Sequence, residues 1–148
     1  MVLPVKNGWI IDFVSARLVW DALDNQLIGA LSEMCEEGHL FCCRCESDLF
    51  KSHDGLRPPF IEDQDCRLNL TDAIIDRLEA LAHAANGGMN GKRMLPGVDS
   101  SQHIVACAIE FDYGVISNKV SDTFITTTDL CHHCNVEVLT TQQFKDLL

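Results

Sequence analysis

The sequence predicts an α/β domain of three layers (α/β/α), in which helices cover both faces of a central parallel sheet. Short apolar runs alternate with longer segments whose apolar residues recur at helical spacing, and this alternation is typical of strand–helix–strand units. The run HLFCC lacks the polar alternation of a half-exposed strand, so it indicates a strand buried on both faces. Hydrophobic residues make up 47% of the 148 residues, so we expect one domain, residues 1–148, with a packed core.

The first half of the chain supplies two of the strands. The run WII, residues 9–11, is apolar and partly β-branched and predicts the first strand. Two segments with helical spacing follow over residues 16–25 and 26–38, and Gly38 stands where a glycine commonly ends a helix. The run HLFCC then predicts a second buried strand over residues 39–43.

The second half of the chain is predicted to hold two further strands. Residues 53–69 contain glycine, two prolines and several acids, and they indicate a long surface loop. The apolar runs GVIS and VEVL predict strands over 114–117 and 136–139, whereas 118–134 carries no clear pattern. Helical spacing or capping residues predict the remaining helical segments, which cover 44–53, 72–86, 99–112 and 140–148.

Three acidic residues fall where a predicted strand ends or where the next helix begins. Asp12 directly follows the first strand, Glu46 lies just past the second, and Asp99 opens the helix that leads into the strand at 114–117. Each acid alone could simply cap a helix or favour its first turn. Because parallel sheets bind ligands beyond the carboxyl ends of their strands, we expect the three side chains to converge at one edge. Their convergence favours a metal site.

The order of these features resembles a PIN domain, the fold of many metal-dependent ribonucleases, including the VapC-type toxins of toxin–antitoxin pairs. Residues 9–49 are similar to the family's opening, with a strand, Asp12, two helices, a second strand and then Glu46. Residues 99–124 resemble its second half, and 136–148 its last strand and helix. The resemblance implies a PIN-like fold and a divalent-metal-dependent endoribonuclease that cleaves RNA phosphodiesters.

The resemblance also implies roles for individual residues. In the family, a few acids hold Mg²⁺ or Mn²⁺, and the cation activates a water and neutralises charge on the phosphodiester. By that correspondence the catalytic metal ligands are Asp12, Glu46 and Asp99, and Asp122 is a weaker fourth ligand. Ser15 and Ser101 would orient a ligand or a phosphate.

Two positions depart from the family pattern. The family's third acid would fall on Ser101, and its Thr-x-Asp would fall on Ser117-Asn118-Lys119, which places a cation where a ligand acid is expected. Asp122 is close enough in sequence to substitute. The alternative hypothesis is therefore a catalytically inactive PIN-like protein that acts as a binding or regulatory partner.

The charge of the chain bears on its partners. The net charge of −11 argues against a broad phosphate-binding face, because such faces need clustered Lys and Arg. A divalent cation could offset the repulsion of RNA locally, and a basic, antitoxin-like protein could do so globally. The resemblance adds the expectation of a homodimer. No apolar run reaches the ~18 residues of a membrane span and no signal peptide is evident, so we expect a cytoplasmic protein without a membrane partner.

The cysteines offer a rival metal site. Cys42-x-x-Cys45 and Cys131-x-x-Cys134 are two CxxC pairs, and four thiolates suit zinc. One pair ends a strand and the other precedes one, so in a parallel sheet we expect them a strand length apart, roughly 15–20 Å. Cys131 and Cys134 could still hold a metal together with a partner chain, which would make the protein a zinc-stabilised interaction module.

Overall fold

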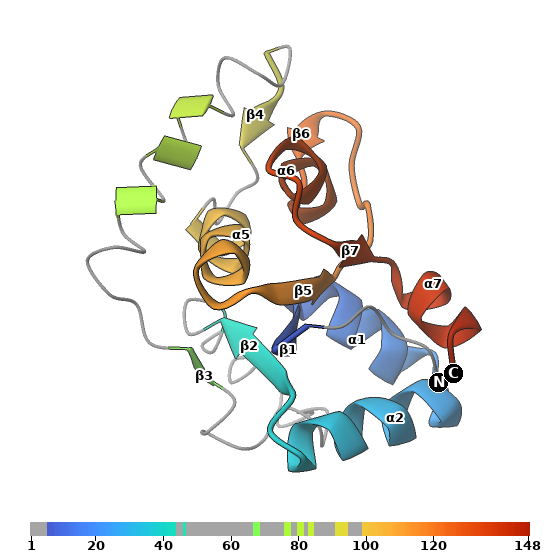
Figure 1. Cartoon of the computed structure of the whole chain (residues 1–148). Coiled ribbons are helices and arrows are strands. Elements are labelled where there is room, and N and C mark those ends of the chain that lie inside the picture. The colour runs from blue at the N-terminus through green and yellow to red at the C-terminus, as the bar shows by residue number, and fades with distance from the viewer. Residues whose placement is uncertain are drawn as a thin grey trace.

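The computed structural model describes residues 6–43, 46, 67–68, 76–77, 80–81, 83–84, 91–94 and 99–148 of the chain. It is an α/β structure built around a parallel sheet (Figure 1). The strands of this sheet are β1 (Gly8–Ile11), β2 (Leu40–Cys43), β3 (Arg67–Leu68), β5 (Tyr113–Ile116) and β7 (Val138–Leu139), and a second pair consists of β4 (Arg93–Met94) and β6 (Phe124–Ile125). The helices are α1 (Phe13–Asp21), α2 (Asn25–Glu36), α5 (Asp99–Phe111), α6 (Thr127–His133) and α7 (Thr141–Asp146).

Strand β1 lies in the middle of the sheet. The strand order is β3-β2-β1-β5-β7, and neighbouring strands run parallel. On one side of β1, Trp9 lies opposite Leu40 of β2; on the other, Ile11 lies opposite Ile116 of β5. The residue that follows β1 therefore emerges at the centre of the carboxyl edge, beside the residue that follows β5.

Both faces of the sheet are covered by helices, as the alternation of strands and helices in the sequence predicts. Side chains alternate between the faces along each strand, so each strand contributes to two hydrophobic cores. On one face the strand residues Ile10, Cys43 and Val115 pack with residues of α5 and α6. On the other face the strand residues Trp9, Ile11, Leu40, Cys42 and Ile116 pack with residues of α1, α2 and α7. The arrangement is consistent with three α/β/α layers (Figure 1).

Close packing between β1 and β5 depends on one glycine. Trp9 and Gly114 are opposite each other in the parallel pairing, and the Trp9 ring lies over the glycine. A Cβ added at Gly114 would overlap carbon atoms of that ring. The glycine therefore makes room for a buried indole next to the strand end that carries Asp12.

Most predicted elements are confirmed where the structure describes them, and their ends differ for local reasons. Helix α1 begins at Phe13, earlier than predicted, because Asp12 caps it; Asp24 caps α2 in the same way. Gly38 has a φ of 75°, as expected for a glycine just past a helix end. Thr140 and Gln143 form the predicted capping box of α7.

Two predictions need correction or remain open. The loop predicted over 53–69 is wrong for Arg67 and Leu68, because these residues pair with Cys42 and Cys43 as an edge strand. The unassigned stretch 118–134 contains β6 and α6. The residues described between 76 and 84 are helical, as predicted, whereas the turns predicted over 44–53 lie outside the described residues except for Glu46.

None of the helices described in this chain is long and apolar enough to cross a membrane.

Candidate functional site

Asp12 occupies two structural roles at the end of β1. Its Oδ1 atom accepts a hydrogen bond from the Ser15 backbone N–H at 2.8 Å, which caps α1. Its Oδ2 atom accepts a second hydrogen bond from the Ser117 hydroxyl, which follows β5. The capping interpretation is thus confirmed. It does not account for the 6% exposure of the side chain or for the bond from the neighbouring strand end.

Glu46 follows the carboxyl end of β2 and reaches the same helix end. Its Oε1 atom accepts a hydrogen bond from the Phe13 backbone N–H at 3.2 Å, and the side chain is 4% exposed. The first N–H groups of a helix have no partner within the helix, and its N-terminus favours negative charge. Asp12 and Glu46 therefore bind two N–H groups of the first turn of α1, those of Ser15 and Phe13, and the predicted convergence of these two acids is confirmed.

The two carboxyl groups are in an environment that opposes their ionisation. Burial raises the pKa of Asp12, although hydrogen bonds from Ser117 and Ser15 act in the opposite direction. Burial and the nearby charge of Asp12 raise the pKa of Glu46 well above its ordinary value. Two like charges out of contact with water are costly unless a proton or a cation lies between them. The pair is therefore suited to hold one or the other.

Polar side chains from three elements fix this arrangement. The Ser15 hydroxyl accepts a hydrogen bond from the Asn118 backbone N–H at 3.0 Å. The Ser117 backbone donates to the Leu139 carbonyl at 2.9 Å, and the Ser117 carbonyl accepts from the Thr128 hydroxyl at 3.3 Å. The chain after β5 is thus held against α1, β7 and α6 at once, which fixes the Ser117 hydroxyl beside Asp12.

Asn118 extends this framework to the last helix. Its Oδ1 atom accepts from the Thr141 backbone N–H at 2.9 Å, and its amide group donates to the Thr141 hydroxyl at 3.0 Å. Since the Asn118 backbone also donates to Ser15, one residue links the first turns of α1 and α7. The start of the loop after β5 is therefore rigidly placed.

The other predicted phosphate-orienting residue lies on a neighbouring helix. Ser101, on α5, is 2% exposed and shares a hydrogen bond of 3.0 Å with the Thr127 hydroxyl. Thr127 adjoins Thr128, which binds the Ser117 carbonyl, so Ser101 is connected to the acidic pair through α6. Asp99 begins α5, as predicted, but its side chain lies outside the described part of the structure.

The structure pairs Asp122 with Lys119 and does not show it beside the buried carboxylates. The Lys119 Nζ atom lies 2.8 Å from Asp122 Oδ1, and the Asp122 side chain is 89% exposed. Lys119 lowers the pKa of Asp122 by hydrogen bonding and by its charge. Asp122 is therefore an exposed carboxylate whose charge is already balanced.

The cysteine pair of the rival zinc hypothesis lies on and just after α6. Burial, the charge of Asp12 and the neighbouring Cys134 raise the pKa of Cys131, and burial raises that of Cys134. Zinc binds thiolates, so both shifts make these groups poorer ligands. Cys45, of the other CxxC pair, lies outside the described residues, so the expected separation of the two pairs stays a prediction. Within the described part of the chain, no three His, Cys, Asp or Glu side chains are placed to share a metal ion.

Ser117 and Asn118 were not predicted as site residues, although a signal for Ser117 was present. Ser117 follows a buried apolar strand just as Asp12 does, and adjacent parallel strands end at the same edge. The role of Asn118 depends on α7, which is remote in sequence, so no local pattern could have identified it.

Comparisons with known proteins do not assign the chain to a family. No model of a protein family matches it, and neither a curated protein nor a solved structure does. The geometry at the carboxyl edge is therefore the basis for a functional proposal.

Proposed function

We propose that this chain is a PIN-like, divalent-metal-dependent ribonuclease that cleaves RNA phosphodiesters at the carboxyl edge of its sheet. The observation that carries the proposal is the buried pair of Asp12 and Glu46. A buried pair of like charges destabilises a fold unless it is compensated, and such arrangements concentrate at functional sites. A bound divalent cation would provide the compensation.

The donor set fits Mg²⁺ or Mn²⁺. These hard cations prefer carboxylate oxygens, and Mg²⁺ commonly uses one or two carboxylates together with water and substrate phosphates. Each carboxylate oxygen can accept more than one bond, so the hydrogen bonds to Asp12 leave capacity for a cation. Asp12 and Glu46 would hold it, with Asp99 as the third ligand; Asp122 is not included because Lys119 balances its charge. The cation would supply an activated water and neutralise charge on the phosphodiester.

The protein's own residues prepare this site. Ser15 and Ser117 fix the two oxygens of Asp12, and Phe13 fixes one oxygen of Glu46. These donors belong to packed elements, so they hold the bonded carboxylate oxygens toward the first turn of α1. Fixed ligands reduce the reorganisation needed on binding, which is the usual contribution of the surrounding shell to a metal site.

The proposal is tested by titrating Mn²⁺ into wild-type protein and Asp12→Asn while measuring cleavage of a mixed RNA. Asparagine is as good a helix cap as aspartate, so the variant should fold but lose Mn²⁺ binding and activity. Asp24→Asn is the matched control, because Asp24 caps α2 through the Leu27 N–H in the same way but pairs with Lys145. A wild type that binds no Mn²⁺ and cuts no RNA would refute the proposal.

The second candidate is a PIN-like binding or regulatory protein without catalysis. It is favoured by Ser101 and Lys119, which stand where the family pattern places acids, and by the ion pair that balances Asp122. A basic, antitoxin-like protein would complement the net charge of −11. A folded wild type that is inactive with Mn²⁺ yet captures a basic partner is the result expected for this candidate.

A further inference from the structure

A lysine lies directly beyond the framework that holds the acidic pair. Ser117 donates to Asp12, Asn118 is tied to α1 and α7, and Lys119 is the next residue. The Lys119 side chain is 52% exposed. Its backbone position is therefore set by the site, while its ammonium group remains accessible from solvent.

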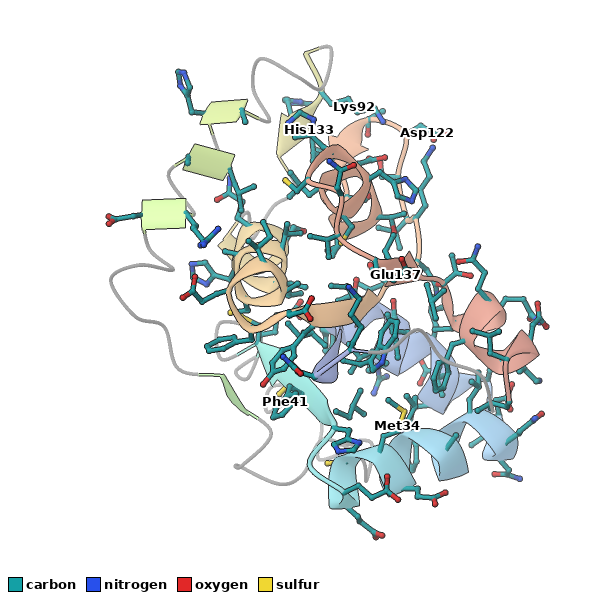
Figure 2. The ribbon with its side chains drawn as sticks, in the orientation of Figure 1. Met34, Phe41, Lys92, Asp122, His133 and Glu137 are labelled. Carbon is teal, nitrogen blue, oxygen red and sulfur yellow. The ribbon has the colours of Figure 1, made fainter. Side chains whose placement is uncertain are left out.

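Lys119 belongs to a group of charged side chains on this side of the molecule. Its Nζ atom lies 2.8 Å from Asp122 Oδ1, and Lys92 Nζ lies 3.5 Å from Asp129 Oδ2. The two pairs also interact with each other, Lys119 with Asp129 and Asp122 with Lys92. Figure 2 shows Lys92 and Asp122 on the same side of the molecule, near α6. Lys92 thus lies beside α6, and Lys119 stands two residues after Ser117, which binds Asp12, in a chain whose net charge is −11.

Lys119 can exchange Asp122 for another anion at little loss of stability. Exposed ion pairs contribute little to stability, since water and salt compete with both groups. A phosphate that approached Lys119 could therefore displace the exposed carboxylate of Asp122 with little loss of free energy. An ammonium on a flexible stem is suited to a phosphate as a point charge.

We propose that Lys119 binds a backbone phosphate of single-stranded RNA beside the acidic site, and that Asp122 is the intramolecular competitor which occupies Lys119 when RNA is absent. The inference rests on the proposed function for its substrate class. It assigns Asp122 to the lysine and not to a metal ion. It also explains how a strongly acidic chain can bind a polyanion, because the attraction is local.

The experiment measures binding of a fluorescent single-stranded RNA of mixed sequence to the full chain in EDTA, at several salt concentrations. The variants are Lys119→Ala, Asp122→Asn and the control Lys6→Ala. Lys6 also pairs with an aspartate, Asp112, at 3.5 Å, but at the opposite edge of the sheet. Lys119→Ala and Lys6→Ala change the net charge equally, so a difference between them reports position.

We expect Lys119→Ala to weaken RNA binding roughly three- to tenfold at low salt and to reduce the salt slope by about 0.7, the loss of one phosphate contact on a single strand. Asp122→Asn should tighten binding, by up to about fivefold, because it removes the competitor. Lys6→Ala should leave the salt slope unchanged. All three substitutions are at exposed or partly exposed side chains, and thermal melting confirms that each variant folds.

Several outcomes overturn the inference: no RNA binding by wild type, equal effects of Lys119→Ala and Lys6→Ala, or no tightening in Asp122→Asn. Cleavage assays with Mn²⁺ separate this result from the proposed function. If wild type cleaves RNA but Lys119 does not affect binding, the ribonuclease proposal stands and the lysine inference fails. If RNA binding depends on Lys119 but no cleavage occurs, the inference stands and catalysis is refuted.

Discussion

The two edges of the parallel sheet carry charge in opposite ways. At the carboxyl edge, Asp12 and Glu46 are buried, share one sign and bind the N-terminal turn of α1. At the amino edge, Lys6 and the exposed Asp112 pair with each other near the end of α5. Ionising both buried carboxyl groups is unfavourable because they repel each other, whereas the opposite charges of Lys6 and Asp112 attract. The carboxyl edge, where the fold keeps two repelling acids, is therefore a better candidate for function than the amino edge, where the charges are paired.

The surface is hollowed near both edges. One cavity, of about 370 Å³, is lined by Lys119, Val120, Ser121 and Asp122 in the loop that follows β5. The other, of about 210 Å³, lies at the amino edge and is lined by residues that include Lys6, Tyr113, Cys134 and Glu137. Its charged residues are paired or exposed, and the helices α5 and α6 end beside it in left-handed residues, Asp112 and Asn135. Such residues are common just past helix ends, so the cavity follows from chain reversal. Hollows therefore occur near both edges, whereas among the described residues the buried pair of like charges lies at the carboxyl edge.

Glu46→Gln should have the largest effect on this comparison. The amide oxygen can still accept from Phe13, but the second negative charge is lost, so we expect Mn²⁺-dependent RNA cleavage to fall at least roughly a hundredfold. Glu137→Gln, at the amino edge, should leave the cleavage rate unchanged. Comparable losses in both variants would show that the two edges are not functionally different.

The Glu46→Gln variant also tests the repulsion between the two acids, through the pH dependence of thermal stability. Burial and Asp12 raise the pKa of Glu46 in the folded protein above its ordinary value of 4.5. The stability due to this group is therefore fully present below that ordinary value and is lost as pH rises through the raised pKa. Metal-free wild type should melt at a lower temperature at about pH 8 than at about pH 5, and Glu46→Gln should lose less, because only Asp12 still contributes. Equal slopes in thermal melts would argue against a buried, repelling pair.

Ser117→Ala should have an intermediate effect. It removes the donor to Asp12 Oδ2 without touching Oδ1, so Mn²⁺ affinity and cleavage should fall about 10- to 100-fold, the range for partners of metal ligands. Ser121→Ala is the matched control, because Ser121 lies in the same loop and, among the described residues, bonds to Thr123 two positions away. Isothermal titration with Mn²⁺ distinguishes the two; unchanged affinity in Ser117→Ala would mean that the hydroxyl does not position Asp12.

Asp112→Asn should have the smallest effect. It breaks an ion pair in which the Asp112 side chain is 70% exposed, so the free energy of unfolding should change by less than about 1 kcal/mol and cleavage not at all. Urea denaturation measures the first and the RNA assay the second. A large loss in either would mean that the amino edge carries a role as well.

The sequence was most informative where local rules decide structure. Apolar runs predicted the strands β1, β2, β5 and β7, and capping chemistry predicted α7, because strand burial and helix ends are set by nearby residues. The convergence of Asp12 and Glu46 was also predictable, since adjacent parallel strands end at one edge. The starts of α1 and α2 were predicted too late, because apolar spacing alone marked them at residues 16 and 26, whereas Asp12 and Asp24 cap the helices just before Phe13 and Asn25.

Other features depend on contacts between distant segments. The edge strand β3 forms only because Arg67 and Leu68 meet β2, and no apolar pattern marks it. The partner of Asp122 was not predicted either, since an acid near a site is as compatible with a metal ion as with Lys119. Propensity is a weak guide at such positions because tertiary pairing determines the conformation.

The double attachment of Asn118 has a mechanical consequence. Because this residue bonds to Ser15 at the start of α1 and to Thr141 at the start of α7, a displacement of the last helix pulls directly on the chain beside Asp12. The coupling is reciprocal by thermodynamic necessity, so whatever stiffens the acidic edge also protects the amide hydrogens of α7 from exchange with deuterium. A change in α7 should therefore alter the acidic edge, and hydrogen exchange in α7 should report on changes at that edge.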